Sequence, residues 1–337
     1  MTAHTAEQTR EQQRLDWARQ ATGKPGIGLE RASVDAGFRS YWRTTGMSPS
    51  RIVMDSPPDK ENVRPWLKIR DLLLSGGVRV PAVLGNDADQ GFMLLEDLGP
   101  DTYLHVIGPD NADALFDAAI DQLLRIQAIP VPAGFPAYDA ELLLRELRLF
   151  DEWFLGTHLG ITLDAGEWDG LQSVYRVLID AALAQPQVLV HRDFMPRNLM
   201  PCRPETAVID FQDAVAGPIA YDPLCLFKDA FLSWPEADAG RWLDHYHARA
   251  SAAGLPVPPL ERFRRDADLI GLHRHLKVIG IFARLNHRDH KPRYIADAAR
   301  FIAYIDAVLP RHPQLRPLAD LLDRRVRPAL RRIAEPA

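Results

Sequence analysis

Residues 188–200, VLVHRDFMPRNLM, carry the strongest signal in this chain of 337 residues. The stretch begins with apolar and β-branched residues, which are typical of a short buried strand. It then places His191, Asp193 and Asn198 in the pattern H-x-D-x-x-x-x-N, and a second β-branched run further on ends at Asp210. We therefore expect two neighbouring strands that both end in polar side chains able to accept a proton or bind a metal ion.

Phosphoryl transfer requires this set of side chains. A carboxylate must orient the acceptor hydroxyl and accept its proton, while an amide oxygen and a second carboxylate hold Mg²⁺ against the phosphates. Asp193 suits the first role, Asn198 and Asp210 suit the second, and His191 is expected to brace the catalytic loop. The alternative is that these residues only cap turns, but capping explains one such residue more readily than three in this order.

The segments at residues 191–200 and 208–226 resemble the aminoglycoside phosphotransferase branch of the protein-kinase-like fold. The resemblance implies an α+β fold with a small β-rich N-terminal lobe and a larger helical C-terminal lobe that carries the catalytic loop and the substrate site. It also implies that ATP and Mg²⁺, or Mn²⁺, are the cofactors. Asp222 stands where this branch often keeps a second, structural aspartate.

The pattern of the remaining sequence agrees with this order of lobes. Strand patterns bounded by Gly and Pro predominate before residue 99, with a helix among them at residues 61–77, and helical periodicity predominates afterwards. We predict lobes at residues 1–98 and 99–337, with a hinge at about residues 95–99. The first long helix of the second lobe, residues 111–128, is expected to bury one face, made of Leu115, Ala118, Ala119 and Leu123.

The N-terminal lobe departs from the kinase pattern at the phosphate-binding lysine. Protein kinases carry this lysine on the third strand, but here the corresponding place holds Met54 and Asp55. We hypothesise that Arg39 or Arg43, which flank the second strand, replaces it. Alternatively, residues 35–40 bind the phosphates mainly through backbone N–H groups, or the chain is an inactive kinase-like binding module.

The resemblance also locates the adenine site. It implies that the backbone around Leu95, Glu96 and Leu98, in the connector between the lobes, forms hydrogen bonds with the edge of the adenine ring.

Several stretches together resemble the bacterial anomeric kinases of N-acetylmuramic acid and N-acetylglucosamine: FRSYWR, VMDSPPDKENV, FMLLEDLG, HRDFMPRNLM and LKVIGIFARLNHRDHKPRY. Those enzymes make the sugar α-1-phosphate during peptidoglycan recycling. Because N-acetylmuramate carries a lactyl carboxylate, an arginine is its natural partner. The candidates are Arg145, Arg197 and Arg284, and Trp153 is a candidate stacking surface for the sugar.

An aminoglycoside substrate would require a dense acidic pocket, since that ligand is polycationic. Four acidic residues do cluster on the helical stretch after residue 139, but their spacing puts them on different faces, and arginines lie between them. We therefore expect a solvated helix surface, formed by Glu141, Glu146, Asp151 and Glu152.

Composition excludes other classes of function. The formal net charge of −5 argues against non-specific nucleic-acid binding. The polar N-terminus is unlike a secretory signal, no apolar run is long enough to span a bilayer, and two cysteines are too few for a disulfide framework. His245 with His247 and His273 with His275 have i, i+2 spacing, which does not share a helix face. No cysteine or tight carboxylate motif accompanies these pairs or His287 with His290, so no zinc site is expected. We predict a cytoplasmic enzyme that needs no obligate protein partner.

Overall fold

The computed structural model describes residues 2–33 and 38–334. The chain divides into two compact units, the first formed by residues 1–129 and 193–214 and the second by residues 130–192 and 215–337. A five-stranded antiparallel sheet in the first unit and a mostly helical second unit confirm the predicted α+β, protein-kinase-like class. The lobe boundaries at residues 1–98 and 99–337 remain a prediction.

The sheet of the first unit has the strand order β1-β2-β3-β5-β4. All neighbouring strands are antiparallel. The residues between β1 and β2, 34–37, lie outside the described part of the chain, and the proposed backbone phosphate cradle falls partly on them. The strands are β1 (Gly28–Ser33), β2 (Ser40–Thr45), β3 (Arg51–Asp55), β4 (Val83–Asp87) and β5 (Phe92–Glu96).

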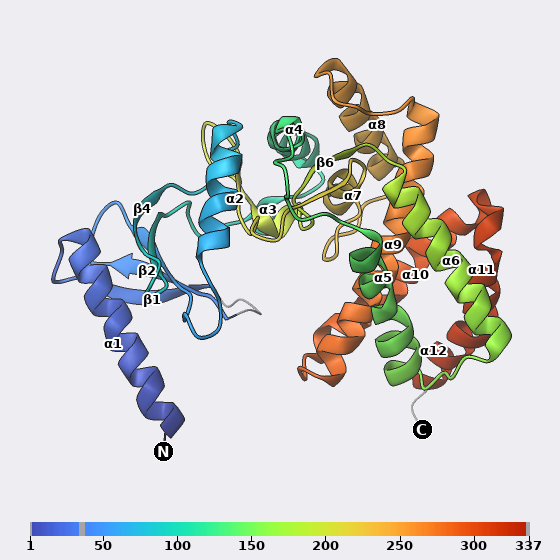
Figure 1. Cartoon of the computed structure of the whole chain (residues 1–337), viewed down its shortest axis with the longest axis horizontal. Coiled ribbons are helices and arrows are strands. Elements are labelled where there is room, and N and C mark those ends of the chain that lie inside the picture. Colours follow the sequence, from blue (N-terminus) through green and yellow to red (C-terminus); the bar gives the residue numbers. More distant parts are fainter. Residues whose placement is uncertain (1, 34–37, 335–337) are drawn as a thin grey trace. The chain divides into compact units, whose positions relative to one another are not determined.

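Helix α1 (Thr2–Thr22) covers one face of this sheet (Figure 1). Directly opposed residues of antiparallel strands point to the same face, so the paired residues Trp42, Val53 and Leu94 share a face. Ala18 of α1 packs into a core with Val53 and Leu94, and Trp17 stacks on Phe92 with ring centroids 5.5 Å apart. This helix was not predicted, because its sequence is polar and has almost no helical periodicity of apolar residues.

The first unit also contains helices α2 (Arg64–Ser75), α3 (Tyr103–Val106) and α4 (Ala112–Ala128). Helix α4 forms where predicted, but its predicted face was wrong in part. Leu115 and Ala118 are only partly buried. The fully buried stripe is offset by about one residue and consists of Phe116, Ala119, Ile120 and Leu123.

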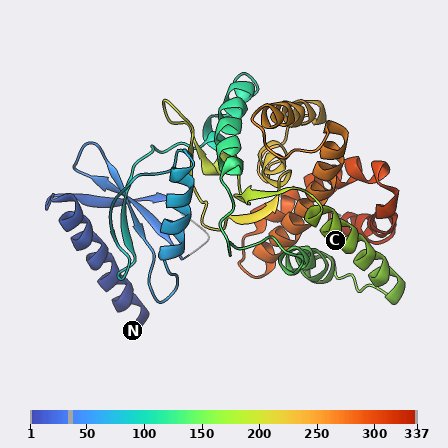
Figure 2. The same ribbon diagram turned by 45° about the horizontal axis from the view of Figure 1, so that its top comes forward.

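In the second unit, β6 (Gln187–Val190) pairs antiparallel with β9 (Val215–Pro218), and Figure 2 shows these two short strands side by side. The long helix α9 packs against α5, η1, α6 and α10, and most of its length is buried. The helices are α5 (Ala140–Leu149), the π-helix η1 (Phe150–His158), α6 (Ala165–Leu183), α7 (Tyr221–Phe227), α8 (Glu236–Ala252), α9 (Leu260–His287), α10 (Ala298–Val308), α11 (Arg316–Leu321) and α12 (Arg327–Ala334). In the described residues, no helix has the length and apolar character needed to cross a membrane.

Candidate active site

The loop at residues 193–214 brings the predicted catalytic and metal-binding residues together within the first unit. Strands β7 (Leu199–Met200) and β8 (Ala207–Val208) form a small antiparallel hairpin, which returns the chain from Asn198 to Asp210. The amide nitrogen of Asn198 donates to the backbone oxygen of Asp193 at 2.9 Å and lies 3.4 Å from Oδ2 of Asp210. The spacing seen in the sequence is therefore a spatial cluster.

The donor set of this loop fits a magnesium ion. Because the nitrogen of the Asn198 amide is bonded to protein oxygens, its oxygen is the atom left for a metal. Asp210 has φ 64°, a left-handed conformation that costs free energy in an aspartate and is concentrated at functional sites. Gln212, which sequence reasoning missed, donates to Oδ1 of Asp210 at 3.0 Å. Magnesium is usually held by one or two protein groups together with phosphates and water, and the loop offers two.

A buried aspartate in the second unit fixes the chain just before Asp193. Asp222 is fully buried, and its carboxylate accepts the backbone N–H groups of His191 at 2.7 Å and of Arg192 at 3.0 Å. This is the structural role that the resemblance implied for Asp222. His191 itself is 1% exposed, which agrees with a bracing residue more than with a proton acceptor.

The side chain of Arg192 enters a buried polar network in the same unit. The Glu146 carboxylate lies 2.5 Å from the guanidinium of Arg192 and 2.8 Å from Nζ of Lys277, and it also accepts a hydrogen bond from the Tyr138 hydroxyl. Burial opposes ionisation of Glu146, but Lys277 and Arg192 outweigh it and lower the pKa of Glu146 to about 2. Sequence reasoning had no signal for this network, because its members are far apart in the chain.

This network corrects the prediction that the acidic residues form a solvated surface. Glu146 is buried, and the Asp151 side chain is only 8% exposed and accepts a hydrogen bond from Tyr175 at 3.0 Å. Burial raises the pKa of Asp151 to about 6. Glu141 and Glu152 are exposed, as predicted. Two of the four carboxylates, those of Glu146 on α5 and Asp151 on η1, therefore point into the protein interior.

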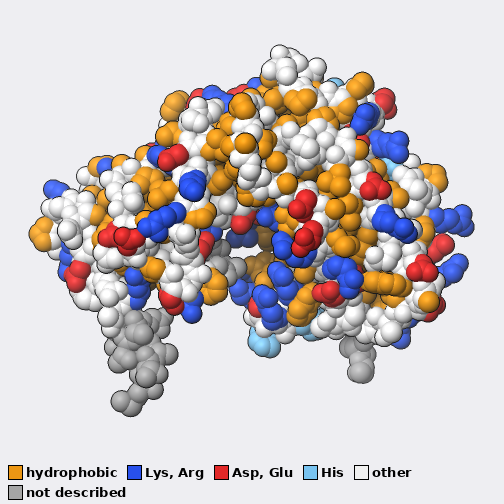
Figure 3. Space-filling model, viewed as in Figure 1, with side chains coloured by type: hydrophobic (Ala, Val, Ile, Leu, Met, Phe, Trp, Pro, Cys, Tyr) orange, Lys and Arg blue, Asp and Glu red, His pale blue; other side chains and the backbone are white. Residues whose placement is uncertain are grey.

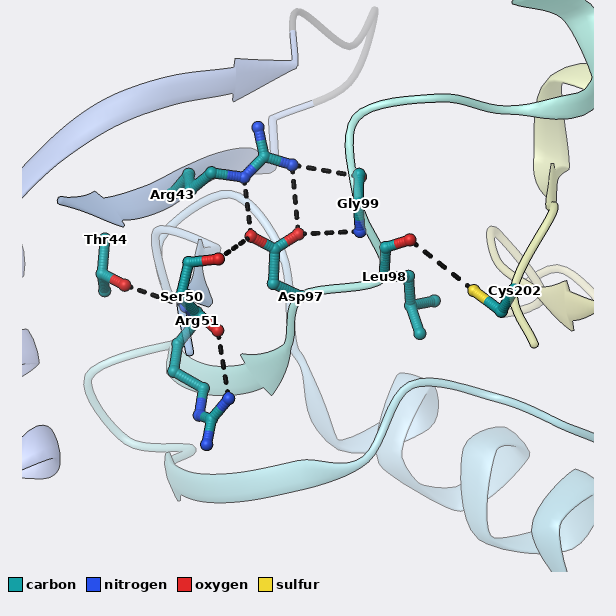
Figure 4. Close-up of polar contacts among 8 residues, drawn as sticks. All are labelled: Arg43, Thr44, Ser50, Arg51, Asp97, Leu98, Gly99 and Cys202. Carbon is teal, nitrogen blue, oxygen red and sulfur yellow. Dashed lines mark hydrogen bonds and ion pairs between the residues drawn. The ribbon is translucent and has the colours of Figure 1, made fainter. Parts of the chain in front are cut away.

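Arg43, a candidate phosphate ligand, is bound to the connector that follows β5 (Figure 4). Its Nε lies 2.6 Å from Oδ2 of Asp97, and its Nη2 donates to Oδ1 of Asp97 and to the backbone oxygen of Gly99. Ser50 also donates to Asp97, at 2.6 Å. Burial opposes ionisation of Asp97, but the hydrogen bonds from Arg43 and Ser50 outweigh it, and its pKa falls to about 2. In the structure Arg43 thus stabilises the connector.

Arg39, the other candidate, has a different environment. Its Nε lies 3.3 Å from Oε2 of Glu61, just before α2, and its side chain is 11% exposed. A kinase-type third-strand lysine forms an ion pair with a glutamate of the following helix. Arg39 and Glu61 form a comparable pair of a buried cation and a carboxylate in the first unit.

The residues at the usual lysine position have other roles. Asp55 is on the face of the sheet that α1 covers, where it binds Arg10 at 2.7 Å and Arg14 at 2.9 Å. Met54 is on the opposite face, paired with Tyr41 across the strands, and is fully buried. Asp55 therefore attaches α1 to the sheet.

The predicted adenine-contacting residues lie at the end of β5. Leu95 is buried in the strand, and the backbone N–H of Glu96 donates to the Ala82 oxygen at 2.9 Å. The Glu96 carboxylate forms an ion pair with Arg79, at 2.5 Å. The backbone oxygen of Leu98 accepts a weak hydrogen bond from the Cys202 thiol at 3.6 Å (Figure 4).

The four candidate substrate residues are divided between the units. Arg197 is exposed in the loop of the first unit. In the second unit, Arg145 is exposed on α5, whereas Trp153 on η1 and Arg284 on α9 are partly buried. In the part of the chain that the structure describes, no three His, Cys, Asp or Glu side chains are arranged to hold a metal ion.

Comparison with known proteins gives consistent matches. A model of the phosphotransferase enzyme family matches residues 28–255. A protein of Pseudomonas putida named N-acetylmuramate/N-acetylglucosamine kinase is 53% identical over 88% of both chains, and one of the same name from Neisseria meningitidis is 42% identical over 91% of this chain and 93% of its own.

Solved structures are similar at the level of the fold. An ADP-bound aminoglycoside phosphotransferase matches with a TM-score of 0.58 at 16% identity, covering 85% of this chain and 97% of its own. An ethanolamine kinase of Plasmodium vivax matches with a TM-score of 0.61 at 12% identity, covering 89% of this chain and 88% of its own. Both support the kinase-like architecture.

Proposed function

The chain belongs to the phosphotransferase enzyme family, and we propose that it is a cytoplasmic, ATP- and Mg²⁺-dependent sugar kinase that phosphorylates the anomeric hydroxyl of N-acetylmuramate, N-acetylglucosamine, or both. The names and the extent of the matching relatives support this substrate class. The structural observation that carries the proposal is the clustering of Asp193, Asn198 and Asp210 in one loop.

In the proposed reaction, the anomeric oxygen attacks the γ-phosphorus of ATP, the bond to the leaving ADP breaks, and Asp193 accepts the hydroxyl proton. The anomeric hydroxyl is more acidic than an ordinary alcohol, so a carboxylate is a sufficient base. Asn198 and Asp210 would hold Mg²⁺, which supplies charge neutralisation on the phosphates. Asp222 and Glu146 would fix the residues that precede Asp193.

For the nucleotide, we propose that Arg39 takes the role of the missing lysine and that Arg43 acts through Asp97 in the connector. The Arg39–Glu61 ion pair supports the first assignment, and the bidentate contact of Arg43 with Asp97 supports the second. The backbone of Leu95, Glu96 and Leu98 remains the proposed adenine site. For the sugar, Arg145, Trp153, Arg197 and Arg284 remain candidates.

The test is ATP consumption by the purified protein with Mg²⁺ and N-acetylmuramate, N-acetylglucosamine, kanamycin, homoserine or choline, with ³¹P NMR of the products. We expect an anomeric phosphate from the amino sugars only. Turnover of kanamycin alone would contradict the proposed substrate, and no turnover by folded protein would favour an inactive binding module.

The proposed base is tested by Asp193→Asn. This substitution preserves size but removes the proton acceptor, so we expect ATP binding within about twofold of wild type and a decrease in kcat of about 10²–10⁴-fold. Asp210→Ala is the comparison, since it should also weaken binding of the metal–nucleotide complex in equilibrium titrations. Wild-type turnover by Asp193→Asn would exclude this residue from the mechanism.

A further inference from the structure

Helix α9 runs beside α5 and η1, and contacts along its length define how the helices are aligned. His273 of α9 bonds the backbone oxygen of Leu143 at 3.0 Å, and His287 bonds His158, at the other end, at 3.0 Å. Because residue numbers increase together in both contacts, the helices run in the same direction. Figure 1 shows α9 beside α5 and the green helical turns that follow it.

Between these contacts the two helices approach closely at one point. A Cβ atom placed on Gly280 would lie 2.4 Å from the backbone oxygen of Leu149, so only glycine fits there. Arg284 lies between Gly280 and His287 on α9, and Trp153 lies between Leu149 and His158 on η1. The alignment therefore puts Arg284 level with Trp153.

Arg284 is a partly buried cation without an anion. Among the residues that the structure describes, no carboxylate lies within ion-pair distance of Arg284, and its Nε is buried without a hydrogen-bond partner. The nearby Asp289 is bound by both Nε and Nη2 of Arg288, at 2.7 and 2.9 Å. Burial, followed by repulsion from Arg288, lowers the pKa of Arg284. Removing a charge from water without a partner costs free energy, and a bound anion would offset that cost.

The acidic residues of η1 do not supply this anion. Asp151 and Glu152 lie 3.1 and 3.4 Å from nitrogens of Arg148. The charged groups that act on Arg284 are Arg288, which repels it, and Asp289, which is bound to Arg288. In Figure 3, Lys and Arg side chains gather on this unit near the place where the C-terminal end of α9 lies in Figure 1.

Within the second unit, ion pairs connect α9 to Arg192, the residue that precedes Asp193 in the chain. Lys277, seven residues before Arg284 on α9, binds Glu146, which binds Arg192. Seven helical residues span about 10 Å, so Arg284 is about two turns along α9 from Lys277.

We propose that Arg284 binds the lactyl carboxylate of N-acetylmuramate, with Trp153 packing against the sugar, and that Arg284 thereby sets the preference for N-acetylmuramate over N-acetylglucosamine. This inference rests on the proposed function, since it takes N-acetylmuramate as a substrate. It selects Arg284 over Arg145 and Arg197, which are both exposed and would gain little from a solvated ion pair.

The experiment compares kcat and KM for the two sugars in wild type, Arg284→Met, Arg284→Lys and Arg264→Met. Methionine keeps the apolar stem and removes the charge. For Arg284→Met we expect kcat/KM for N-acetylmuramate to fall about 10- to 100-fold, mainly through KM, and that for N-acetylglucosamine to change less than about twofold. Lysine should restore part of the loss. Arg264→Met, the matched control, removes an exposed arginine of the same helix that is already bound to Asp244 and should leave both sugars unchanged.

If Arg284→Met lowers kcat/KM equally for both sugars, or changes it for neither, the inference is overturned. Arg284 would then be a charge that stabilises the C-terminus of the helix. A wild-type enzyme inactive on both sugars would instead overturn the proposed function itself. If Arg284→Met does not fold, wild type and Arg284→Lys are compared on N-acetylmuramate and its neutral lactyl amide. Equal discrimination between acid and amide by both proteins would overturn the inference; reduced discrimination by the lysine variant would support it.

Discussion

At the scale of single residues, the main departure from the kinase pattern is the distribution of charge around β2 and β3. The place that carries the lysine in kinases holds Met54 and Asp55, and the Asp55 carboxylate binds two arginines of α1 on the face of the sheet that this helix covers. Two arginines remain near β2, and each has a different carboxylate partner. The expected effects of removing them are therefore distinct.

Arg39→Met is expected to raise KM for ATP by about tenfold, since it removes a charge-assisted contact to phosphate. Arg43→Met should have a smaller effect that Asp97→Asn reproduces, because we propose that both act through the connector. Steady-state kinetics with varied ATP provide the measurement. If Arg43 instead contacts the phosphates, the effects of Arg43→Met and Asp97→Asn on KM will add in the double variant, whereas members of one pair give non-additive effects.

At the scale of secondary-structure elements, α1 is attached to the sheet by one buried carboxylate. The side chains of Asp55 and Arg14 are 3% and 8% exposed, and the Arg14 guanidinium lies 3.6 Å from the centroid of the Trp42 ring. Arg10 contacts the same carboxylate and lies over Phe92. Removing one member of such a cluster leaves an uncompensated charge in the protein interior.

Asp55→Ala is therefore expected to lower the free energy of unfolding of the chain by about 3–5 kcal/mol. Urea denaturation monitored by tryptophan fluorescence is suitable, because Trp17 and Trp42 lie at this contact. The control is Asp16→Ala, which removes an exposed carboxylate of α1 that lies 3.8 Å from Arg19 and should change stability by less than about 0.5 kcal/mol. Equal effects of the two substitutions would show that Asp55 does not hold the helix in place.

At the scale of the whole molecule, stability should depend on pH through carboxylates with shifted pKa values. The pKa of Glu146 falls from 4.5 to about 2 on folding. The contribution of Glu146 to the free energy of unfolding is therefore fully present above pH 4.5 and is lost as the pH falls towards 2. Asp151 acts in the opposite direction, because a pKa raised from 3.8 to about 6 lowers stability as the pH rises through that range.

Glu146→Gln should be less stable than wild type at pH 7, and the difference should shrink between pH 5 and pH 2.5, by on the order of 3 kcal/mol in total. Thermal or urea unfolding at several pH values checks this. Glu141→Gln, an exposed change on the same helix, should follow the wild-type curve. A constant difference between Glu146→Gln and wild type at all pH values would mean that the carboxylate charge is not the cause.

Features that depend on local spacing could be predicted from the sequence. Features that depend on partners far away in the chain could not. The order of Asp193, Asn198 and Asp210, and the strand and helix patterns, are local signals, and the structure brings these three residues together. The burial of Glu146 could not be foreseen, because its partner Lys277 is on another helix. For the same reason, the ion pairs of Arg10 and Arg14 with Asp55 could not be predicted from the polar N-terminal segment.

The attachment of α1 has a practical consequence for protein production. A gene fragment trimmed to the part matching the family, residues 28–255, would omit Arg10 and Arg14 and would leave Asp55 as an unpaired carboxylate in an uncovered sheet. It would also omit α9, and with it the Lys277 partner of Glu146. The recognisable family region is thus smaller than the smallest piece expected to fold, and expression trials should retain both flanks.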